Sequence, residues 1–385
     1  MNIILFDSDR TNFHPLSYTR PIAEFRFGIL TIKQKWECYF KNVSVYTESY
    51  LSEKFSINQK KDNLWIDARV LPSKVLITEL ESLRKGEALE KDGYLFAFRN
   101  RDFDLKKINK ISTSVKFDSI NNVWDIFSDN EREIKNDFKL ITKGRKSQVV
   151  DDTNAVIGKQ IFIEKGAKVS CSILNAEAGP IYIGKNAEVM EGSIIRGPFA
   201  MCDNAVLKMG AKIYGPTTLG PYCKAGGEIN NSVFFGFSSK AHDGFLGNSV
   251  IGEWCNLGAD TNNSNLKNNY AEVKLWNYEM ERFKKTGLQF CGLIMGDHSK
   301  CGINTMFNTG TVVGVSANIF GSGFPRNFIP SFSWGGASGF SVYKLPKVFE
   351  VASKVFDRRK KKFDEIEQSI LSEVYDMTKR YRNEQ

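Results

Sequence analysis

Residues 181–220 read IYIGKNAEVMEGSIIRGPFAMCDNAVLKMGAKIYGPTTLG and carry a pattern that returns every six residues. The residues at the repeating position are apolar, namely Ile183, Val189, Ile195, Met201, Leu207, Ile213 and Leu219. The fourth residue after each is usually small, as at Ala187, Ser193, Ala205, Ala211 and Thr217. A period of six matches neither the period of a helix nor the alternation of a strand. It is typical of a parallel β-helix, in which each side of a coil places one apolar side chain inside.

The same repeat extends in both directions from this stretch. Its other positions are Ile157, Ile163, Val169, Ile251, Leu257, Met295, Cys301, Phe307, Val313 and Ile319. The repeat breaks briefly at 175–180 and again over a long insertion at 262–292. A loop of that length inside a compact coil is usually functional, but a plain hairpin that pads a subunit contact is an equal alternative. We predict a domain of hexapeptide repeats over residues 146–335.

The first part of the chain has a different pattern. Short apolar runs at 3–6, 44–47 and 93–99 read as buried strands. Between the first two, apolar residues recur at helical spacing over 25–40, which predicts a helix. Strand, helix and strand in this order predict an α/β domain with a parallel sheet over residues 1–145.

Two further segments set the remaining boundaries. The charged stretch KGRKSQVVDD, residues 143–152, leads into the repeats, so we place the first boundary near residue 145. From residue 347 to residue 381 apolar residues recur at helical spacing, which predicts a terminal helix within a helical segment at 336–385. The basic run at 358–362 is expected to interrupt this helix, and we assign it no ligand because such runs are usually solvated.

Composition limits the class of protein. The chain has 385 residues, of which 42% are hydrophobic, so it can bury a sizeable core in two domains and an appendage. No apolar stretch is long enough to span a membrane, and the start MNIILFDSDR lacks the features of a signal peptide, so we expect a cytoplasmic protein. The seven cysteines include no CxxC pair, so we expect no disulfide framework and no zinc site. We predict that Cys171, Cys223, Cys255 and Cys301 are buried small residues of the repeat.

The net charge of +9 is compatible with nucleic acid or with a small polyphosphate ligand. Aromatic residues do not alternate with lysine and arginine as they do on a nucleic-acid platform, so we predict no nucleic-acid partner. The chain has only three histidines, and two of them, His242 and His298, fall in the repeats. A zinc enzyme on such a rod needs three converging histidines, so we predict no metal site there.

His242 is the best candidate for catalysis in the repeat domain. It lies in SSKAHDGFLG, residues 238–247, where the six-residue register loosens. Beside glycine and aspartate it is expected to face a cleft, where a histidine can accept a proton from an amine or hydroxyl group near neutral pH. The alternative is a histidine in a surface loop without a role. His298 is the weaker candidate because it lies between inward positions of a regular coil.

The segment SSKAHDGFLGNSVIGEWCNLGAD, residues 238–260, resembles the acetyltransferase half of the bacterial bifunctional enzyme that makes UDP-N-acetylglucosamine. That family joins a sugar nucleotidyltransferase domain of Rossmann-like fold to a left-handed β-helix that forms a trimer. The resemblance implies that His242 is the catalytic base, that Phe245 replaces a substrate-binding tyrosine, and that Asn256 contacts the substrate. It also implies that Ala259 contacts acetyl-CoA.

The segment departs from the family at two positions that would bind the substrate phosphate. A family arginine is replaced near Asp203, and a family lysine is replaced near Asn230. Arg196, Lys240 and Lys267 are our candidates to take their place. These departures leave the identity of the sugar phosphate open more than the class of reaction.

The first domain carries a fainter resemblance to sugar nucleotidyltransferases. The strand at 3–6 is followed by DSDRTNFHPLSYTRPIAEFR, residues 7–26, which is similar to the family's phosphate loop but lacks its glycines and lysine. Arg10 falls near the loop arginine, and Arg20 and Arg26 are possible replacements for the lysine. The resemblance implies that these three arginines contact phosphate and that nucleotidyl transfer depends on Mg²⁺.

Together these features predict a multifunctional transferase of nucleotide-sugar biosynthesis. One site would transfer the acetyl group of acetyl-CoA to an amino sugar phosphate, and the other would join a sugar 1-phosphate to a nucleoside triphosphate. We also predict a homotrimer, because the family forms trimers and the terminal helix would offer an apolar stripe to a neighbour. The alternative is a non-catalytic or regulatory scaffold that binds a nucleotide sugar and has a degenerate first domain.

Overall fold

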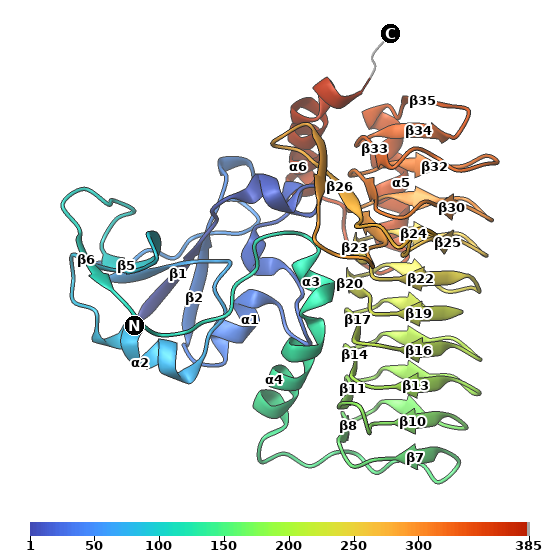
Figure 1. The fold of residues 1–385 in the computed structure, drawn as a ribbon, viewed down its shortest axis with the longest axis horizontal. Helices are drawn as coiled ribbons and strands as arrows, with labels where there is room; N and C mark the ends of the chain where they lie inside the picture. The colour runs from blue at the N-terminus through green and yellow to red at the C-terminus, as the bar shows by residue number, and fades with distance from the viewer. Residues whose placement is uncertain (383–385) are drawn as a thin grey trace.

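The structure, a computed structural model that describes residues 1–382, consists of an N-terminal domain, a long β-solenoid and two C-terminal helices (Figure 1). The N-terminal domain lies against one side of the solenoid, and α4 (Asn130–Thr142) lies between them. Among the described residues, no helix is long and apolar enough to cross a membrane.

Short strands of the solenoid stack in parallel into three sheets, which we call faces 1, 2 and 3. Face 1 contains β7 (Ala155–Ile157), β10 (Ile173–Asn175), β13 (Ile194–Arg196), β16 (Lys212–Tyr214), β19 (Glu228–Asn230) and β22 (Phe245–Gly247). Face 2 contains β8 (Ile161–Ile163), β11 (Ile181–Ile183), β14 (Phe199–Met201), β17 (Thr217–Leu219), β20 (Val233–Gly236), β23 (Val250–Glu253), β28 (Leu293–Met295), β31 (Thr311–Val313) and β33 (Phe328–Ile329).

Face 3 contains β9 (Lys168–Val169), β12 (Glu188–Val189), β15 (Val206–Leu207), β18 (Lys224–Ala225), β21 (Ser239–Lys240), β24 (Asn256–Leu257), β29 (Lys300–Cys301), β32 (Asn318–Ile319), β34 (Ser333–Gly336) and the antiparallel β35 (Gly339–Val342). A separate parallel pair joins β25 (Asn262–Asn263) to β30 (Met306–Phe307). The predicted parallel β-helix is therefore confirmed, and its left-handed sense stays a prediction.

The interior of the solenoid follows the predicted register. From Ile163 onward, the repeating residues form one buried cluster with Ala187, Ala205 and Ala211. The prediction fails in the first coil, where Val156 rather than Ile157 pairs with the inward Leu174, and Ile157 is 41% exposed. It also fails at Cys171, which lies on an exposed turn, whereas the other three predicted cysteines are buried.

The long insertion forms an antiparallel hairpin of β26 (Lys274–Asn277) and β27 (Arg282–Lys285). Its Trp276 ring stacks on Phe328 with centroids 4.2 Å apart. Tyr278 of the hairpin contacts Tyr18 of the N-terminal domain edge to face, at 5.6 Å. The insertion therefore packs within its own chain and helps to hold the domains together.

The N-terminal sheet has the order β2-β1-β3-β5-β4-β6. Its strands are β1 (Asn2–Phe6), β2 (Asn42–Tyr46), β3 (Asn63–Asp67), β4 (Glu87–Lys91), β5 (Tyr94–Asn100) and β6 (Asn109–Ser112). β1 is parallel to β2 and β3, but β5 is antiparallel to β3 and β4. β4 is also parallel to β6. The sheet is thus mixed, and the prediction of a parallel sheet fails at β5.

The helices of this domain are short. They are α1 (Ile32–Glu37), α2 (Lys74–Ser82), α3 (Asp125–Ser128) and α4, with 3-10 turns η1 (Arg10–Phe13), η2 (Leu16–Tyr18), η3 (Ile22–Glu24) and η4 (Ser49–Leu51). α1 is shorter than predicted because the chain turns at Gly28, whose φ is +82°, before Thr31 caps the helix. The side chain of Thr31 accepts a hydrogen bond from the Gln34 amide, and the Gln34 side chain accepts one from the Thr31 amide.

One hydrophobic cluster runs from the N-terminal domain across face 2. Phe25 of the first domain packs on Phe235 of β20 with ring centroids 5.4 Å apart. On α4, the side-chain amide of Asn130 donates to Pro216 O at 3.0 Å and to Thr218 Oγ1 at 3.1 Å. The N-terminal domain is therefore docked on the solenoid by apolar packing and by buried hydrogen bonds.

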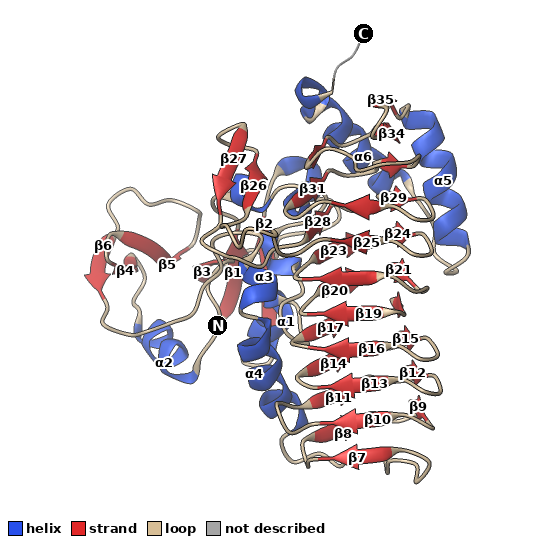
Figure 2. Cartoon of the chain, turned by 45° about the vertical axis from the view of Figure 1, so that its right-hand side comes forward, coloured by secondary structure: helices blue, strands red, loops and turns tan. Residues whose placement is uncertain are grey.

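The C-terminal segment forms α5 (Leu345–Asp357), α6 (Glu365–Met377) and η5 (Lys379–Tyr381), so the predicted interruption at the basic run is confirmed. Figure 2 shows α5 running along the last coils of the solenoid. Phe356 of α5 stacks on Trp254 with centroids 3.9 Å apart. Apolar residues of both helices are buried in the chain's own core, namely Val348, Ala352, Phe356, Ile370, Leu371 and Val374. The apolar stripe that we expected a neighbouring subunit to cover is thus covered within the chain.

Candidate functional sites

His242 is exposed on the turn that joins β21 on face 3 to β22 on face 1. We call the stacked turns between these faces, residues 241–244 and 258–261, the corner. The next turn of the corner is tied to the His242 turn, since the amide of Asp260 donates to Asp243 O at 3.0 Å. The imidazole therefore stands on a rigid backbone and faces outward.

Lys240 supports this turn from inside the solenoid. It pairs with Ala225 at an inward register position and is only 1% exposed. Its ammonium group donates to His242 O at 2.7 Å, Asp243 O at 3.1 Å and Gly226 O at 3.2 Å. Burial lowers the pKa of Lys240 to about 8, although the carboxylates of Asp243 and Asp260 act in the opposite direction. This position does not support the predicted contact of Lys240 with a substrate phosphate.

Asn256 and Ala259 lie one coil beyond His242. Asn256 is exposed at the start of β24 and pairs in register with Ser239 of β21. Ala259 is half-buried in the corner turn, and its carbonyl accepts a hydrogen bond from the Asn304 amide at 2.9 Å. The two residues thus follow His242 by one coil on the same side of the solenoid.

Phe245 begins β22, directly after the corner. Its amide donates to Asn262 Oδ1 at 2.8 Å, which fixes the strand against the next coil. The ring lies over Gly247, where an added Cβ would come within 2.6 Å of Phe245 Cζ. Glycine at this position lets the half-buried ring lie flat on face 1, beside the corner.

Two predicted residues of the solenoid lie away from this group. Arg196 is exposed at the end of β13, which is three strands from β22 along face 1 and therefore about 14 Å away. Lys267 lies at the start of the insertion, where its ammonium group donates to Glu272 O at 3.0 Å. Neither residue is near His242 in this chain.

The side chain of His298 is buried and does not face a cleft at the solenoid surface. It is buried under α5, with its ring stacked against Phe356 at a centroid distance of 6.0 Å. Burial lowers the pKa of His298 well below its ordinary value, and nearby lysines act in the same direction. The weaker of the two histidine candidates thus packs as a neutral core residue.

In the N-terminal domain, the side chain of Arg10 stabilises the loop in which it lies. Its guanidinium forms an ion pair with Asp7 and donates to Ser17 O. It also donates to Thr47 Oγ1 at 3.1 Å, and its side chain is 9% exposed. Burial raises the pKa of Asp7, against the opposing effect of Arg10.

Arg20 and Arg26 reach across to the solenoid. Arg20 forms ion pairs with Asp297 and, at 3.0 Å, with Glu253 Oε1. Arg26 donates through Nε to Phe235 O at 3.1 Å. Burial alone would lower the pKa of Arg20, but the carboxylates of Asp297 and Glu253 raise it. The sequence pattern could not show that these two arginines join the domains, and their predicted phosphate contacts stay untested.

A crevice at the carboxyl ends of β1 and β3 contains residues that the sequence reading missed. β1 is flanked by β2 and β3 in the parallel part of the sheet, and ligands of open α/β sheets bind outside such strand ends. Arg69 donates to Asp67 Oδ2 at 2.9 Å and to Asp9 Oδ2 at 2.6 Å, and Tyr94 donates to Asp67 Oδ2 at 2.6 Å. In the sequence, the only indication of this crevice is the apolar strand NLWID, residues 63–67, with Arg69 two residues after it.

The crevice opens into a cavity of about 430 Å³ that Asp9, Arg69, Lys91 and Tyr94 help to line. The side chain of Asp9 is 59% exposed and is thus the most accessible carboxylate of this network. Within residues 1–382, no group of three or more His, Cys, Asp or Glu side chains could hold a metal ion. The predicted Mg²⁺ stays a prediction, because one or two carboxylates together with substrate phosphates are enough to bind this ion.

Comparison with known proteins finds a similarity for the N-terminal part of the chain. Residues 3–146 match the family model described as sugar nucleotidyl transferase. No curated protein matches the chain in sequence. Among solved structures, one match is a mutant of AntD, an N-acyltransferase from Bacillus cereus, in complex with dTDP and coenzyme A. It is 13% identical, covers 55% of this chain and 100% of that chain, and has a TM-score of 0.23, which is too low to support a conclusion about this chain.

Proposed function

We propose that this chain is a transferase of nucleotide-sugar metabolism whose solenoid transfers an acyl group from coenzyme A to the amine of a sugar phosphate or nucleotide sugar. The match of residues 3–146 to sugar nucleotidyl transferases supports the substrate class. The observation that carries the reaction class is the corner, where an exposed His242 stands beside Phe245 and one coil from Asn256 and Ala259.

In the proposed reaction, the amine nitrogen of the sugar attacks the thioester carbonyl of acetyl-CoA. His242 accepts the proton that the nitrogen loses, the carbon–sulfur bond breaks, and coenzyme A leaves as the thiol or thiolate. Phe245 provides an apolar surface for the sugar ring, and Asn256 offers a polar side chain on the next coil. Backbone amides of the corner near Ala259 would stabilise the oxyanion of the intermediate.

The corner is open in one chain, so the site needs a second wall. We propose that the chain forms a homotrimer in which a neighbour closes the corner, since soluble homo-oligomers usually have closed symmetry. Face 1 carries exposed apolar side chains in successive strands, namely Ile157, Ile173, Ile194 and Tyr214. This face is therefore the surface that we expect a neighbour to cover, in place of the terminal helices.

For the N-terminal domain, one observation favours binding without nucleotidyl transfer. Arg10, Arg20 and Arg26, the predicted phosphate contacts, are all engaged inside the protein. The crevice near Asp9 and Arg69, at the carboxyl ends of parallel strands, is a candidate place for the nucleotide sugar in this domain. We therefore propose that the domain positions a nucleotide sugar, and that any nucleotidyl transfer, with Mg²⁺ bound mainly by the substrate phosphates, is slow.

The experiment tests acyl transfer from acetyl-CoA to a panel of amino sugar phosphates and amino nucleotide sugars. The rate is measured from the release of the coenzyme A thiol. We expect His242→Ala to lower kcat by about 10² to 10⁴, the usual effect of removing a positioned proton acceptor. Asp243→Asn is the matched control, since Asp243 is exposed on the same turn, and we expect it to keep most of the activity.

Both variants should melt at the wild-type temperature, because exposed side chains contribute little to stability. Full activity of His242→Ala would exclude His242 as the base. A wild-type protein that transfers no acyl group to any acceptor of the panel would favour the nucleotide-sugar-binding scaffold instead.

A further inference from the structure

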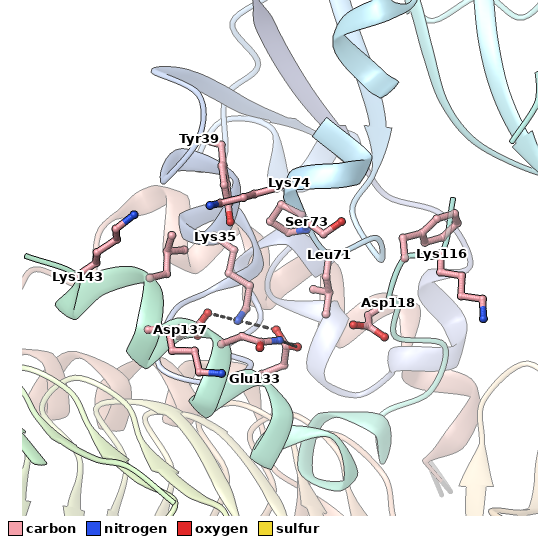
Figure 3. A pocket seen from close by; sticks show the side chains of 15 residues that line it. Lys35, Tyr39, Leu71, Ser73, Lys74, Lys116, Asp118, Glu133, Asp137 and Lys143 are labelled. Carbon is pink, nitrogen blue, oxygen red and sulfur yellow. Dashed lines mark hydrogen bonds and ion pairs between the residues drawn. The ribbon is translucent and has the colours of Figure 1, made fainter. Parts of the chain in front are cut away.

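A further cavity of the N-terminal domain lies apart from both candidate sites. It has a volume of about 590 Å³ and lies between α1, the start of α2 and α4 (Figure 3). Its apolar walls include Tyr39, Leu71, Pro72 and Leu140. This volume is within the range of pockets that bind small organic molecules.

The floor of the cavity is a closed set of charges. Lys35 Nζ forms ion pairs with Glu133 Oε2 at 2.8 Å and with Asp137 Oδ1 at 2.5 Å, and all three side chains are at most 4% exposed. Asp137 Oδ2 also accepts hydrogen bonds from the amides of Ile29 and Leu30, at 2.8 and 3.0 Å. The floor holds one ammonium group and two carboxylates, so its formal charge is negative, and a phosphate would bind at the rim and not at the floor.

The rim, in contrast, carries positive charge without partners. Besides Lys35 of the floor, four lysines line the cavity at its rim, Lys74, Lys116, Lys139 and Lys143, and none of these four forms an ion pair within residues 1–382. Asp118, the acidic residue of the rim, lies 3.5 Å from Arg132. Figure 3 shows Lys74 and Lys143 reaching toward one another from opposite walls. The start of α2, capped by Ser73, adds the positive end of a helix dipole to the same rim.

We propose that this cavity binds a small organic molecule with at least two phosphate charges, such as a nucleotide or a coenzyme. Lysine ammonium groups bind phosphate as point charges, and the helix start suits the same anion. The apolar walls would contact the organic part of the molecule. This site is separate from the acyl-transfer corner and from the crevice at Asp9 and Arg69, so it does not depend on the proposed function.

The position of the cavity gives such a ligand a structural effect. Lys74 belongs to the part of the domain that follows β3, whereas Lys143 follows α4 and leads into the solenoid. α4 contacts face 2 through Asn130, as described above. A phosphate held by both lysines would therefore stiffen the connection between the domain and the solenoid.

The test is calorimetric titration of the full chain with inorganic pyrophosphate, dTDP and coenzyme A. We expect dTDP or coenzyme A to bind more tightly than pyrophosphate, and the double variant Lys74→Met with Lys143→Met to weaken this binding about tenfold or more. The control is Lys106→Met with Lys159→Met, which removes the same charge from two exposed lysines outside the cavity. We expect the control to bind within about twofold of the wild type.

A second variant separates shape from charge. Leu140→Trp enlarges a side chain of the cavity wall without changing the net charge, and we expect it to remove the same binding event that the lysine pair variant weakens, with binding at the corner or the crevice unchanged. A melting curve shows whether each variant is folded. The proposal is overturned if none of the three probes binds at millimolar concentration, or if the lysine pair and its control bind alike. Tighter binding of pyrophosphate than of both organic probes would overturn the organic part of the assignment.

Discussion

The loop at residues 7–26 and the corner at 241–261 both contain residues that the sequence marks as ligand-binding, but they use them in opposite ways. In the loop, the guanidinium groups turn inward and bind carboxylates and carbonyls of the same chain. At the corner, His242 and Asn256 are exposed, and the one inward cation, Lys240, holds the turn from below. A basic residue in a phosphate-loop position is therefore not evidence of a phosphate site until its own partners are known.

The largest effect that we expect tests the difference between inward and outward positions. Leu207→Asp places a charge without a partner in the solenoid interior, where Leu207 is 0% exposed, and should cost several kcal/mol and prevent folding. Met209→Asp is the control on the same coil, because Met209 is 69% exposed. We expect it to change the free energy of unfolding by less than about 0.5 kcal/mol. Equal melting temperatures of the two variants would contradict the observed register.

The second effect tests whether the arginines of the loop serve the fold. Asp297→Ala removes a partner of buried Arg20 and also the acceptor of a 2.8 Å hydrogen bond from Thr19 Oγ1. Loss of one partner in a buried ion pair costs about 3 to 5 kcal/mol, so we expect a large fall in the denaturant midpoint. Asp243→Ala, at the exposed corner, is the control. A midpoint within error of the wild type would mean that the pair of Arg20 with Asp297 does not stabilise the fold.

A smaller effect concerns the pH dependence of stability. Burial lowers the pKa of Lys240 to about 8, and an unfolded lysine titrates near about 10.4. Between these values the unfolded chain binds more protons than the folded chain, so the contribution of Lys240 to stability rises with pH. The free energy of unfolding of the wild type should therefore increase between about pH 7.5 and pH 10. We expect this increase to be smaller in Lys240→Met by about 1 to 2 kcal/mol. Parallel stability curves for the two proteins would show that the ammonium group is not desolvated.

The smallest effect that we expect is at Phe245, which lies directly after the corner. Phe245→Tyr adds a hydroxyl group to a half-buried ring and should change the free energy of unfolding by less than about 1 kcal/mol. We expect the variant to bind a hexosamine phosphate more tightly if that molecule is close to the natural acceptor. Binding is measured by titration, with the natural Phe245 protein as the reference. Weaker binding of every amino sugar phosphate would place the acceptor away from this ring.

The solenoid was predictable because its signal is local and repeated. From Ile183 to Leu219 each inward residue follows the previous one by six, and one coil later His242 is followed by Ala259, so local spacing brings these residues to one corner. The prediction failed at Ile157, in the first coil, and at Cys171, which lies on the turn two residues after the inward Val169 and has a φ of +50°.

The N-terminal domain was less predictable because its structure depends on distant partners. The reversal of β5 relative to β3 leaves no periodic trace in the sequence. The direction of Arg20 and Arg26 is set by Asp297 and Phe235, which follow them by more than 200 residues. The cavity under Lys74 and Lys143 likewise forms only when α2 and α4 pack together.

The contact between Arg20 and Asp297 also determines the order in which this protein can be completed during synthesis. The two residues are 277 positions apart, so most of the solenoid must leave the ribosome before Arg20 meets its carboxylate. Until β20 is synthesised, the first domain also exposes Phe25, which later packs on Phe235 of face 2. Exposed apolar surface on a nascent domain promotes aggregation. The nascent chain therefore needs protection for as long as translation of the coils takes.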